Sequence, residues 1–517
     1  MDELTTRKKV TIMISIMSTL LFVALNQTIV GTALPKIVAD IGGMQYFNWV
    51  FTIFMLASSI TAILVGKLSD IYGRKPFILI GLGVFTLGAF LNGTSGTIFH
   101  LITYRGIQGL GGGMIMSTAF TAVGDLFPPR ERGRWQGLMG ASFGLASVFG
   151  PTLGGYIVDH FHWHWVFWVF LPFGLVAFGL IWWLFPPQAK REGETVDYIG
   201  ALVLVLTLVP LLLAVSWAGS AYAWLSPVIL GLLAASAGAF ILFIFIERRA
   251  KSPILPLHLF ANRIFTISNI VGFMLGVGMF GTIMYMPFFI QGVMGATATA
   301  SGFMMMAMTL SNVSGSAISG QIVTKTGKYK KLALGGLAIM ASGLVAATFL
   351  SAGVHPSFVV ACLIVIGFGL GTCFPIFTLT VQNAIPHSYL GVATSSAQLF
   401  RQLGGAVGVS AMGSIMNALV ARQMTNHATT AAELPQLQRQ LDELQNPQLL
   451  MDHDKLAQLQ AGLPSGAQPV VAELIDQLRG ALGTALSGVF FTGACVIAVA
   501  FVLTLFLKEI KLRTTNR

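Results

Sequence analysis

The sequence is poor in charged residues and in cysteine. Charged residues make up 9% of the 517 residues and apolar residues 55%, whereas a soluble domain carries about 25% charge. A soluble fold cannot hide that much apolar surface, so a soluble enzyme or binding module is excluded. The three cysteines, Cys362, Cys373 and Cys495, all lie within apolar runs and lack metal-ligand spacing. We therefore expect buried thiols, no metal site and no cofactor.

Long apolar runs fill most of the chain. Runs of about 20 residues, the length that crosses a bilayer as a helix, follow one another with short polar breaks. We therefore expect an all-α membrane protein with fourteen spans. The expected spans are residues 11–33, 47–65, 77–96, 99–123, 136–158, 165–185, 199–217, 225–246, 266–290, 299–322, 332–352, 356–381, 396–420 and 484–507. The first run is too long for a signal peptide and lacks a cleavage site, so we expect an uncleaved span.

The positive charge is distributed unevenly between the two sides of these spans. Most of the 30 Lys and Arg residues lie in the breaks that share a side with the N-terminus. Cytoplasmic loops of membrane proteins carry such an excess, so both termini are predicted to be cytoplasmic. The net charge of +11 then reflects topology, and no nucleic-acid partner is expected.

A charged turn separates the second and third runs. It consists of Gly66, Lys67, Leu68, Ser69, Asp70, Ile71, Tyr72, Gly73, Arg74 and Lys75. Its glycines, Gly66 and Gly73, allow two helices to approach closely. The turn resembles the Gly-x-x-x-Asp-x-x-Gly-Arg-Lys signature of the major facilitator superfamily of secondary transporters. This resemblance implies that Asp70, Arg74 and Asp125 form a network of surface ion pairs that latches the outward-open state.

A weaker copy of the turn lies at residues 320–328, with Thr324 at the position of Asp70. It follows the tenth run, so two extra spans, 199–217 and 225–246, separate the two halves. This arrangement resembles the fourteen-span drug:proton antiporter branch of the superfamily. The resemblance implies a six-helix bundle at 1–190, two inserted spans at 191–262, and a second bundle at 263–517. The last part includes an extracellular loop, 421–483, in which short amphipathic helices are expected over 434–444 and 471–478.

The first span contains a polar stretch, residues 25–35. It is similar to the antiporter signature Leu-Asp-x-Thr-Ile-Val-x-x-Ala-Leu-Pro, except that Asn26 replaces the acid. None of the 19 acidic residues lies in the middle of an expected span. Two explanations are open for Asn26: a natural variant that couples differently, or a deliberate substitution that mimics a protonated acid. The otherwise intact signature favours the second.

Arg105 and Gln108 in the fourth span belong to a stretch similar to the family signature Arg-x-x-Gln-Gly-x-Gly. Asn26 and Arg105 both lie about 10 Å below the outer surface at 1.5 Å per residue. We therefore expect Arg105 to contact Asn26, and assign both to proton coupling. A purely structural Arg105, bonded to backbone carbonyls, is the alternative.

Further positions follow from the same resemblance. Gly150 and Pro151 belong to a Gly-Pro-x-x-Gly-Gly exporter signature that makes a pliable helix. Substrate contacts are expected from four residues that look like family positions lining the cavity: Tyr285, Phe288, Gln291 and Arg401. They are also expected from Asn26 and from Gln108, which lies near Arg105 in sequence. Arg401 is expected about seven residues from the cytoplasmic end of its span, close enough to extend to the surface, so a structural role remains open.

Taken with the resemblance, the sequence predicts a proton-coupled multidrug efflux transporter of the cell membrane. It would export lipophilic, cationic compounds by alternating access, confer antibiotic resistance, and act as a monomer. One alternative is an exporter of a single metabolite, lipid or antibiotic. Another, of a different class, is a non-transporting receptor or scaffold on the same fold. No enzyme is expected, because no nucleophile, base and orienting group occur at recognisable spacing.

Overall fold

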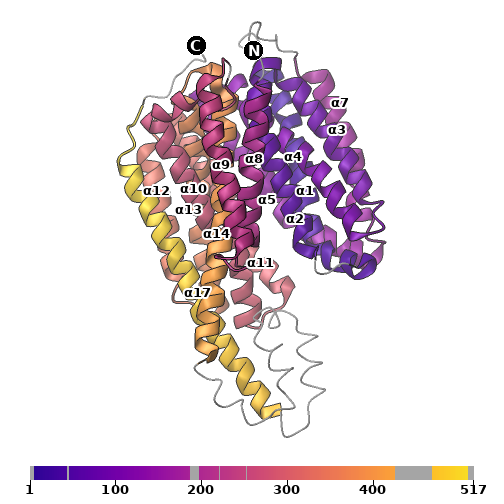
Figure 1. The fold of residues 1–517 in the computed structure, drawn as a ribbon, viewed down its shortest axis with the longest axis vertical. Coiled ribbons are helices and arrows are strands. Elements are labelled where there is room, and N and C mark those ends of the chain that lie inside the picture. The colour runs from indigo at the N-terminus through magenta and orange to yellow at the C-terminus, as the bar shows by residue number, and fades with distance from the viewer. Residues whose placement is uncertain are drawn as a thin grey trace.

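The computed structural model describes residues 5–42, 46–186, 197–219, 222–251, 253–425 and 468–510. In these ranges the chain forms long helices joined by short connections (Figure 1). Twelve of the described helices are long and apolar enough to cross a membrane, which confirms a helical, multi-pass membrane protein. Two further helices of 29 residues each, α4 and α11, pack among them.

The helices have the following bounds: α1 Thr6–Ile41, α2 Phe47–Tyr72, α3 Arg74–Asn92, α4 Ile98–Leu126, α5 Pro129–His160, α6 Trp165–Trp168, α7 Leu171–Leu184, α8 Tyr198–Trp217, α9 Pro227–Arg249, η2 Leu257–Ala261, α10 Arg263–Pro287, η3 Phe288–Val293, α11 Ala298–Thr326, α12 Lys330–Ala347, α13 Pro356–Asn383, η4 His387–Tyr389, α14 Leu390–Thr425 and α17 Gln468–Leu505.

Two segments differ from the sequence expectation. The span predicted over 165–185 is divided into α6 and α7, because Pro172 lies in the first turn of α7, where a proline fits best. The prediction of a separate short helix over 471–478 is wrong, since this stretch is the beginning of α17. Its Ile475 and Leu478 are buried in the core of the last helices. The other expected amphipathic helix, over 434–444, lies outside the described residues.

The large apolar side chains form two main cores. One is built by residues between Ile12 and Phe185, from α1 to α7, which we call the first bundle. The other is built by residues between Ile264 and Leu507, from α10 to α14 together with α17 and η3, which we call the second bundle. Each helix therefore buries its most apolar face against helices of its own bundle.

The α8–α9 pair packs against both bundles. Trp217 at the end of α8 contacts Trp49 of α2, with ring centroids 5.5 Å apart. Ser410 of α14 donates a hydrogen bond to the carbonyl oxygen of Ala218 at 2.7 Å. At the other end of α9, the buried Glu247 accepts backbone N–H bonds from Ile254 and Leu255. This carboxylate holds the connection that leads to η2 and α10.

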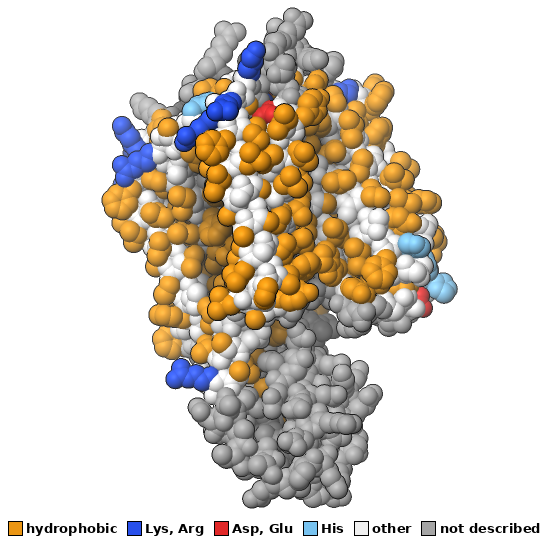
Figure 2. Space-filling view, in the orientation of Figure 1, with side chains coloured by type: hydrophobic (Ala, Val, Ile, Leu, Met, Phe, Trp, Pro, Cys, Tyr) orange, Lys and Arg blue, Asp and Glu red, His pale blue; other side chains and the backbone are white. Residues whose placement is uncertain are grey.

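Positive side chains gather at one end of the molecule. α1 begins and α17 ends there (Figure 1), and the blue side chains of Figure 2 cluster mostly at the same end, above an apolar belt. We call this end the basic end. Helix-terminal residues that place positive charge there include Lys67, Lys75, Arg248, Arg249, Arg263 and Lys330. An apolar belt with positive charge beyond one rim is typical of a membrane protein.

Small residues bring the two bundles together near the basic end. A side-chain carbon on Gly133 of α5 would lie 3.3 Å from the backbone of Gly320 on α11. A side-chain carbon on Gly66 of α2 would collide with Ser395 and lie 2.9 Å from the carbonyl oxygen of Gly391, both on α14. Glycine at these positions permits direct backbone contact between the bundles.

Candidate functional site

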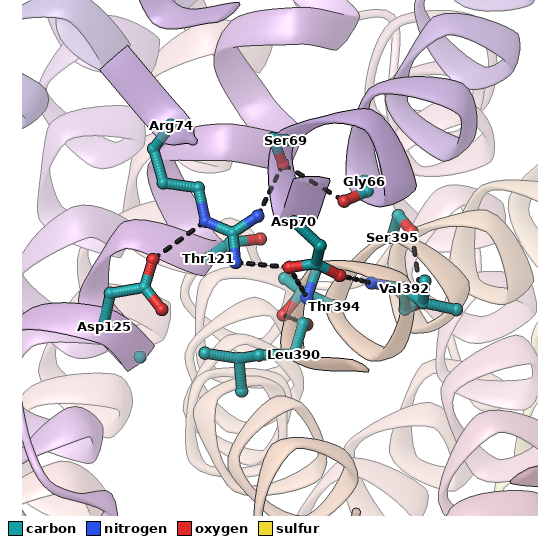
Figure 3. A network of polar contacts seen from close by, with 12 residues as sticks. Gly66, Ser69, Asp70, Arg74, Thr121, Asp125, Leu390, Val392, Thr394 and Ser395 are labelled. Carbon is teal, nitrogen blue, oxygen red and sulfur yellow. Dashed lines mark hydrogen bonds and ion pairs between the residues drawn. The ribbon is translucent and has the colours of Figure 1, made fainter. Parts of the chain in front are cut away.

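The signature turn forms a buried charge network between α2, α3 and α4 (Figure 3). Gly73 has a φ of +89°, a conformation that glycine adopts without strain, and it places Arg74 at the start of α3. The Arg74 Nε donates to Asp125 at 2.8 Å, and its Nη1 donates to the Ser69 hydroxyl at 2.7 Å. The third guanidinium nitrogen, Nη2, donates to Asp70. The expected network is therefore present, but its members are buried rather than exposed surface pairs.

Asp70 also bonds to the second bundle. Its carboxylate accepts the backbone N–H of Gly391 at 3.0 Å and of Val392 at 3.2 Å (Figure 3). These two N–H groups belong to the first turn of α14, where a helix has no internal acceptors and carries a partial positive charge. One acid of the first bundle thus caps a helix of the second. This contact joins residues more than 300 positions apart in the sequence.

The other basic residues of the turn have separate contacts. The Lys67 ammonium lies 5.9 Å from the centre of the Tyr389 ring, just before α14. Lys75 donates to the carbonyl oxygen of Trp182 at the end of α7, at 2.6 Å. Lys67 therefore faces the second bundle, whereas this bond of Lys75 lies within the first.

The second copy of the turn is held by the end of the chain. The Glu509 carboxylate accepts the backbone N–H groups of Tyr329 and Lys330 at 3.1 and 3.4 Å, which caps α12. The Tyr329 hydroxyl donates to the carbonyl oxygen of Lys508 at 3.2 Å and accepts the N–H of Ile510 at 2.9 Å. Burial, with a contribution from the Glu509 charge, raises the pKa of Tyr329, so its hydroxyl stays protonated as a donor.

A buried polar network links α1, α3 and α4 inside the first bundle. The side-chain oxygen of Gln108 accepts bonds from Arg105 Nη1 at 2.8 Å and from Asn92 Nδ2 at 2.9 Å. Two donors at this oxygen fix the orientation of the amide. Its Nε2 then donates to the side-chain oxygen of Asn26 at 2.8 Å. Asn26, Asn92, Gln108 and Arg105 are all at most 1% exposed.

The expected direct contact between Arg105 and Asn26 is replaced by a bridge through Gln108. Arg105 and Gln108 are three residues apart on one face of α4, so the amide occupies the space between guanidinium and Asn26. Arg105 also lies over the Phe54 ring at 4.6 Å and donates weakly to the Val50 carbonyl at 3.5 Å. The Asn26 Nδ2 is buried and finds no hydrogen-bond partner among the described residues. The side-chain oxygen of Asn26 therefore has a donor in Gln108, whereas its side-chain NH2 has no acceptor among the described residues.

Arg401 lies deeper than the sequence suggested. Because α14 begins at Leu390, Arg401 is eleven residues along the helix, about 16 Å at 1.5 Å per residue. The Arg401 side chain is therefore too far from the start of α14 to reach beyond it. The guanidinium instead lies over the Phe374 ring of α13, with its carbon 4.0 Å from the ring centre.

The remaining expected substrate residues lie where α10 ends. The Tyr285 hydroxyl donates to the carbonyl oxygen of Val409 on α14 at 2.5 Å, so it joins two helices of the second bundle. Phe288 and Gln291 follow in η3, a π-helical turn, and both are half-buried. The Tyr285 and Phe288 rings lie 6.0 Å apart. Tyr285, Phe288 and Gln291 therefore lie close together on α10 and η3. The Arg401–Phe374 contact is a different one, made between α14 and α13.

The exporter-like stretch of α5 packs against α1. A side-chain carbon on Gly150 would collide with Thr28, whose hydroxyl donates to the carbonyl oxygen of Ala146 at 3.0 Å. The side chain of Pro151 is outside the described part of the chain. Gly150 is therefore a position of close packing between α5 and the helix that carries Asn26.

Sequence reasoning missed several polar contacts between the bundles. Ser59 of α2 donates to Gln402 of α14, and the Gln136 amide of α5 donates to Gln382 of α13 at 3.3 Å. The available signal was the presence of glutamines in otherwise apolar runs, which costs free energy unless each amide finds a partner. With Asp70, these contacts join the bundles between the basic end and the middle of the helices.

These features define a polytopic membrane protein with two helix bundles in contact near one end, which is the architecture of a transport protein rather than an enzyme. The family profile of the Major Facilitator Superfamily matches residues 16–409, and the chain belongs to this superfamily. The resemblance inferred from the signature turn is thereby confirmed.

Named relatives and solved structures agree with this membership. The chain is 38% identical over 518 residues to the multidrug transporter protein MdtP of Bacillus subtilis, covering 98% of this chain and 94% of the relative. It is 32% identical over 517 residues to multidrug resistance protein 3 of the same organism, covering 100% and 98%. The crystal structure of the human organic anion transporter MFSD10 (TETRAN) has a TM-score of 0.61 at 16% identity, covering 95% and 99%. This last likeness concerns the fold alone.

Proposed function

We propose that this chain is a multidrug efflux transporter that exports lipophilic compounds in exchange for protons by alternating access. In this proposal the helices make fourteen spans, with α6 and α7 crossing together. The first bundle corresponds to residues 1–190, the inserted pair to 191–262 and the second bundle to 263–517. The basic end is cytoplasmic, both termini lie on that side of the plasma membrane, and the protein acts as a monomer. The multidrug activities named for the Bacillus relatives support this function.

The capping of α14 by Asp70 is the observation that carries the proposal. It is a strong interaction because a buried carboxylate accepts two N–H bonds at a helix terminus. It also joins the two bundles at the basic end, so it must break when that end opens. Breaking and re-forming one such contact in each cycle gives a two-state equilibrium that a substrate or proton can bias. We assign the gating role to this turn, with Gly66, Lys67, Gly73, Arg74, Lys75 and Asp125.

Proton coupling is assigned to position 26 and its neighbours. The Gln108 amide presents a donor to this position, oriented by Arg105 and Asn92. A carboxylate would accept that bond and would be stabilised by the nearby guanidinium. Asn26 satisfies the donor but leaves its own Nδ2 without a partner. The surroundings therefore suit an acid better than an amide, which supports the interpretation that Asn26 replaces Asp.

Substrate contacts are proposed for Tyr285, Phe288, Gln291 and Arg401 in the second bundle, and for Asn26 and Gln108 in the first. Aromatic and apolar walls with a few oriented polar groups are typical of sites that accept varied lipophilic compounds. The substrates proposed from the resemblance are lipophilic cations. Arg105 of the first bundle is buried and Arg401 of the second is partly exposed, which bears on the further substrate class considered below.

The test is transport by reconstituted protein. This chain and its Asn26→Asp variant would be placed in liposomes under an imposed pH gradient, with proton flux followed on adding a lipophilic cation such as tetraphenylphosphonium. We expect the Asp variant to couple proton flux to export and the Asn form to lose coupling. Equal coupling by both forms would place the proton site elsewhere. A panel of unrelated compounds separates multidrug export from export of one metabolite, lipid or antibiotic.

A further inference from the structure

The Arg401 guanidinium is a charge in the middle of the second bundle. Within the described residues no carboxylate pairs with it, and its recorded partner is the face of the Phe374 ring. An aromatic face stabilises a cation but carries no net negative charge, so the partly exposed guanidinium remains without a counter-ion among the described residues. A charge at this depth therefore calls for a counter-ion.

A small pocket lies beside this guanidinium, between α10, α13 and α14. It is lined by Ser268, Gly272, Leu275, Leu370, Phe374, Phe377, Thr378, Ala397 and Arg401. No acidic residue is among these. Ser268 is only 1% exposed, yet its hydroxyl has no hydrogen-bond partner in the part of the chain that the structure describes. The pocket thus combines one cation, one buried and unpartnered hydroxyl, and apolar walls.

We propose that this pocket binds an anion, held by Arg401 and Ser268. A guanidinium presents parallel N–H donors that match a carboxylate or a halide, and the hydroxyl adds a further donor. The anion is either the acidic group of an amphiphilic substrate, whose apolar part lies against Phe374 and Phe377, or a free chloride that neutralises Arg401. As the acidic group of a substrate, it rests on the proposed function and extends the exported compounds to amphiphilic anions and zwitterions.

The position of the pocket connects it to the contact between the bundles. The Phe374 ring packs against Phe120 of α4, with centroids 6.2 Å apart. Gln402, the residue after Arg401, is bonded to Ser59 of α2. An anion in the pocket therefore lies next to two contacts that change when the bundles move, so its affinity should differ between the two states.

The test uses two ions with the same alkyl chain and opposite charge. Purified protein in nanodiscs and chloride-free Tris–HEPES buffer would be titrated with octanoate, with octyltrimethylammonium and, separately, with chloride, and binding followed by calorimetry. We expect Arg401→Gln to weaken binding of the anion, but not of the cation, at least tenfold and Ser268→Ala to weaken it several-fold. Binding of octanoate identifies a substrate group, and binding of chloride alone identifies a free ion.

Matched variants separate this role from general damage. Arg263 also lies over a phenylalanine, with its guanidinium carbon 6.0 Å from the Phe506 ring centre, but it is exposed at the basic end, so Arg263→Gln should leave anion binding unchanged. Arg401→Lys keeps the charge but loses the parallel donors, so its affinity should fall between those of the parent and Arg401→Gln. Thermal unfolding gives an independent readout, because a bound anion stabilises only a protein with the site. Chloride or octanoate should raise the Tm of the parent chain and not of Arg401→Gln.

Two results would overturn the proposal: anion affinity within about twofold of the parent in Arg401→Gln, or an equal loss in Arg263→Gln. Its failure is distinguishable from failure of the proposed function. If anion binding depends on Arg401 but liposomes show no export, the pocket stands and the efflux assignment falls. If export proceeds but anion binding does not depend on Arg401, the efflux assignment stands and the anion site is refuted.

Discussion

Substituting Asp70 by Asn should release the contact that holds the two bundles together at the basic end. Asn has nearly the size of Asp, so packing is kept while the charge is lost. Of the interactions that Asp70 makes, the bond from Arg74 lies within the first bundle, so opening of the basic end need not break it. The bonds from Gly391 and Val392 cross between the bundles. These two crossing bonds therefore decide the shift between states.

The magnitude follows from those two bonds. A hydrogen bond to a charged group contributes about 1.5–3 kcal/mol, and the Asn oxygen can keep one of the two in a weaker, neutral form. We expect the closed basic end to lose about 1.5–3 kcal/mol, which shifts the equilibrium toward the opened state by roughly ten- to 150-fold. Export should slow, because the transporter would spend most of its time with the basic end open.

Double electron–electron resonance measures the populations directly. Spin labels would be placed at Glu131, at the start of α5, and at Lys331, at the start of α12; both are exposed and lie in different bundles. Asp70→Asn should populate longer distances. Asp476→Asn is the matched control, since its ion pair with Arg479 lies within α17 and the distances should stay nearly unchanged. A distribution in Asp70→Asn that equals the parent's would refute the capping argument.

Three further predictions concern stability. Glu509→Gln should weaken the cap of α12 by about 1–2 kcal/mol and lower the Tm, whereas Asp476→Asn, which is 78% exposed in its side chain, should not. Gly113→Ala should destabilise the contact between α4 and α2, because its new carbon would collide with the backbone of Ser58 and lie 3.0 Å from Ala62 N. Its control is Gly83→Ala, where a new carbon would have nothing within 4 Å. This control should leave the stability unchanged or raise it by up to about 1 kcal/mol. Glu247→Ala should cost about 1–3 kcal/mol by leaving the N–H groups of Ile254 and Leu255 unbonded, seen as faster hydrogen exchange there; unchanged exchange would contradict this role.

Much of the architecture is determined by composition and pattern. Apolar runs of membrane-spanning length must form helices, because backbone groups in lipid have no other partners. The signature turn, with its two glycines and four charged residues, indicated the superfamily and members of the buried charge network. The stretch around Asn26 and the Arg105–Gln108 pair likewise identified two parts of one network, since polar residues in an apolar run must find partners inside the protein.

Tertiary structure decided which groups meet. Nothing local indicates that Asp70 caps a helix that begins at Leu390, because that contact depends on how two bundles pack. Gln108, rather than Arg105, reaches Asn26, since the helix rotation and not the depth sets the partner. Arg401 is deep because α14 begins earlier than its hydropathy suggested. The sequence supplies helices and their polar residues through local physics, whereas burial and partnership of those residues are long-range properties of the packed chain.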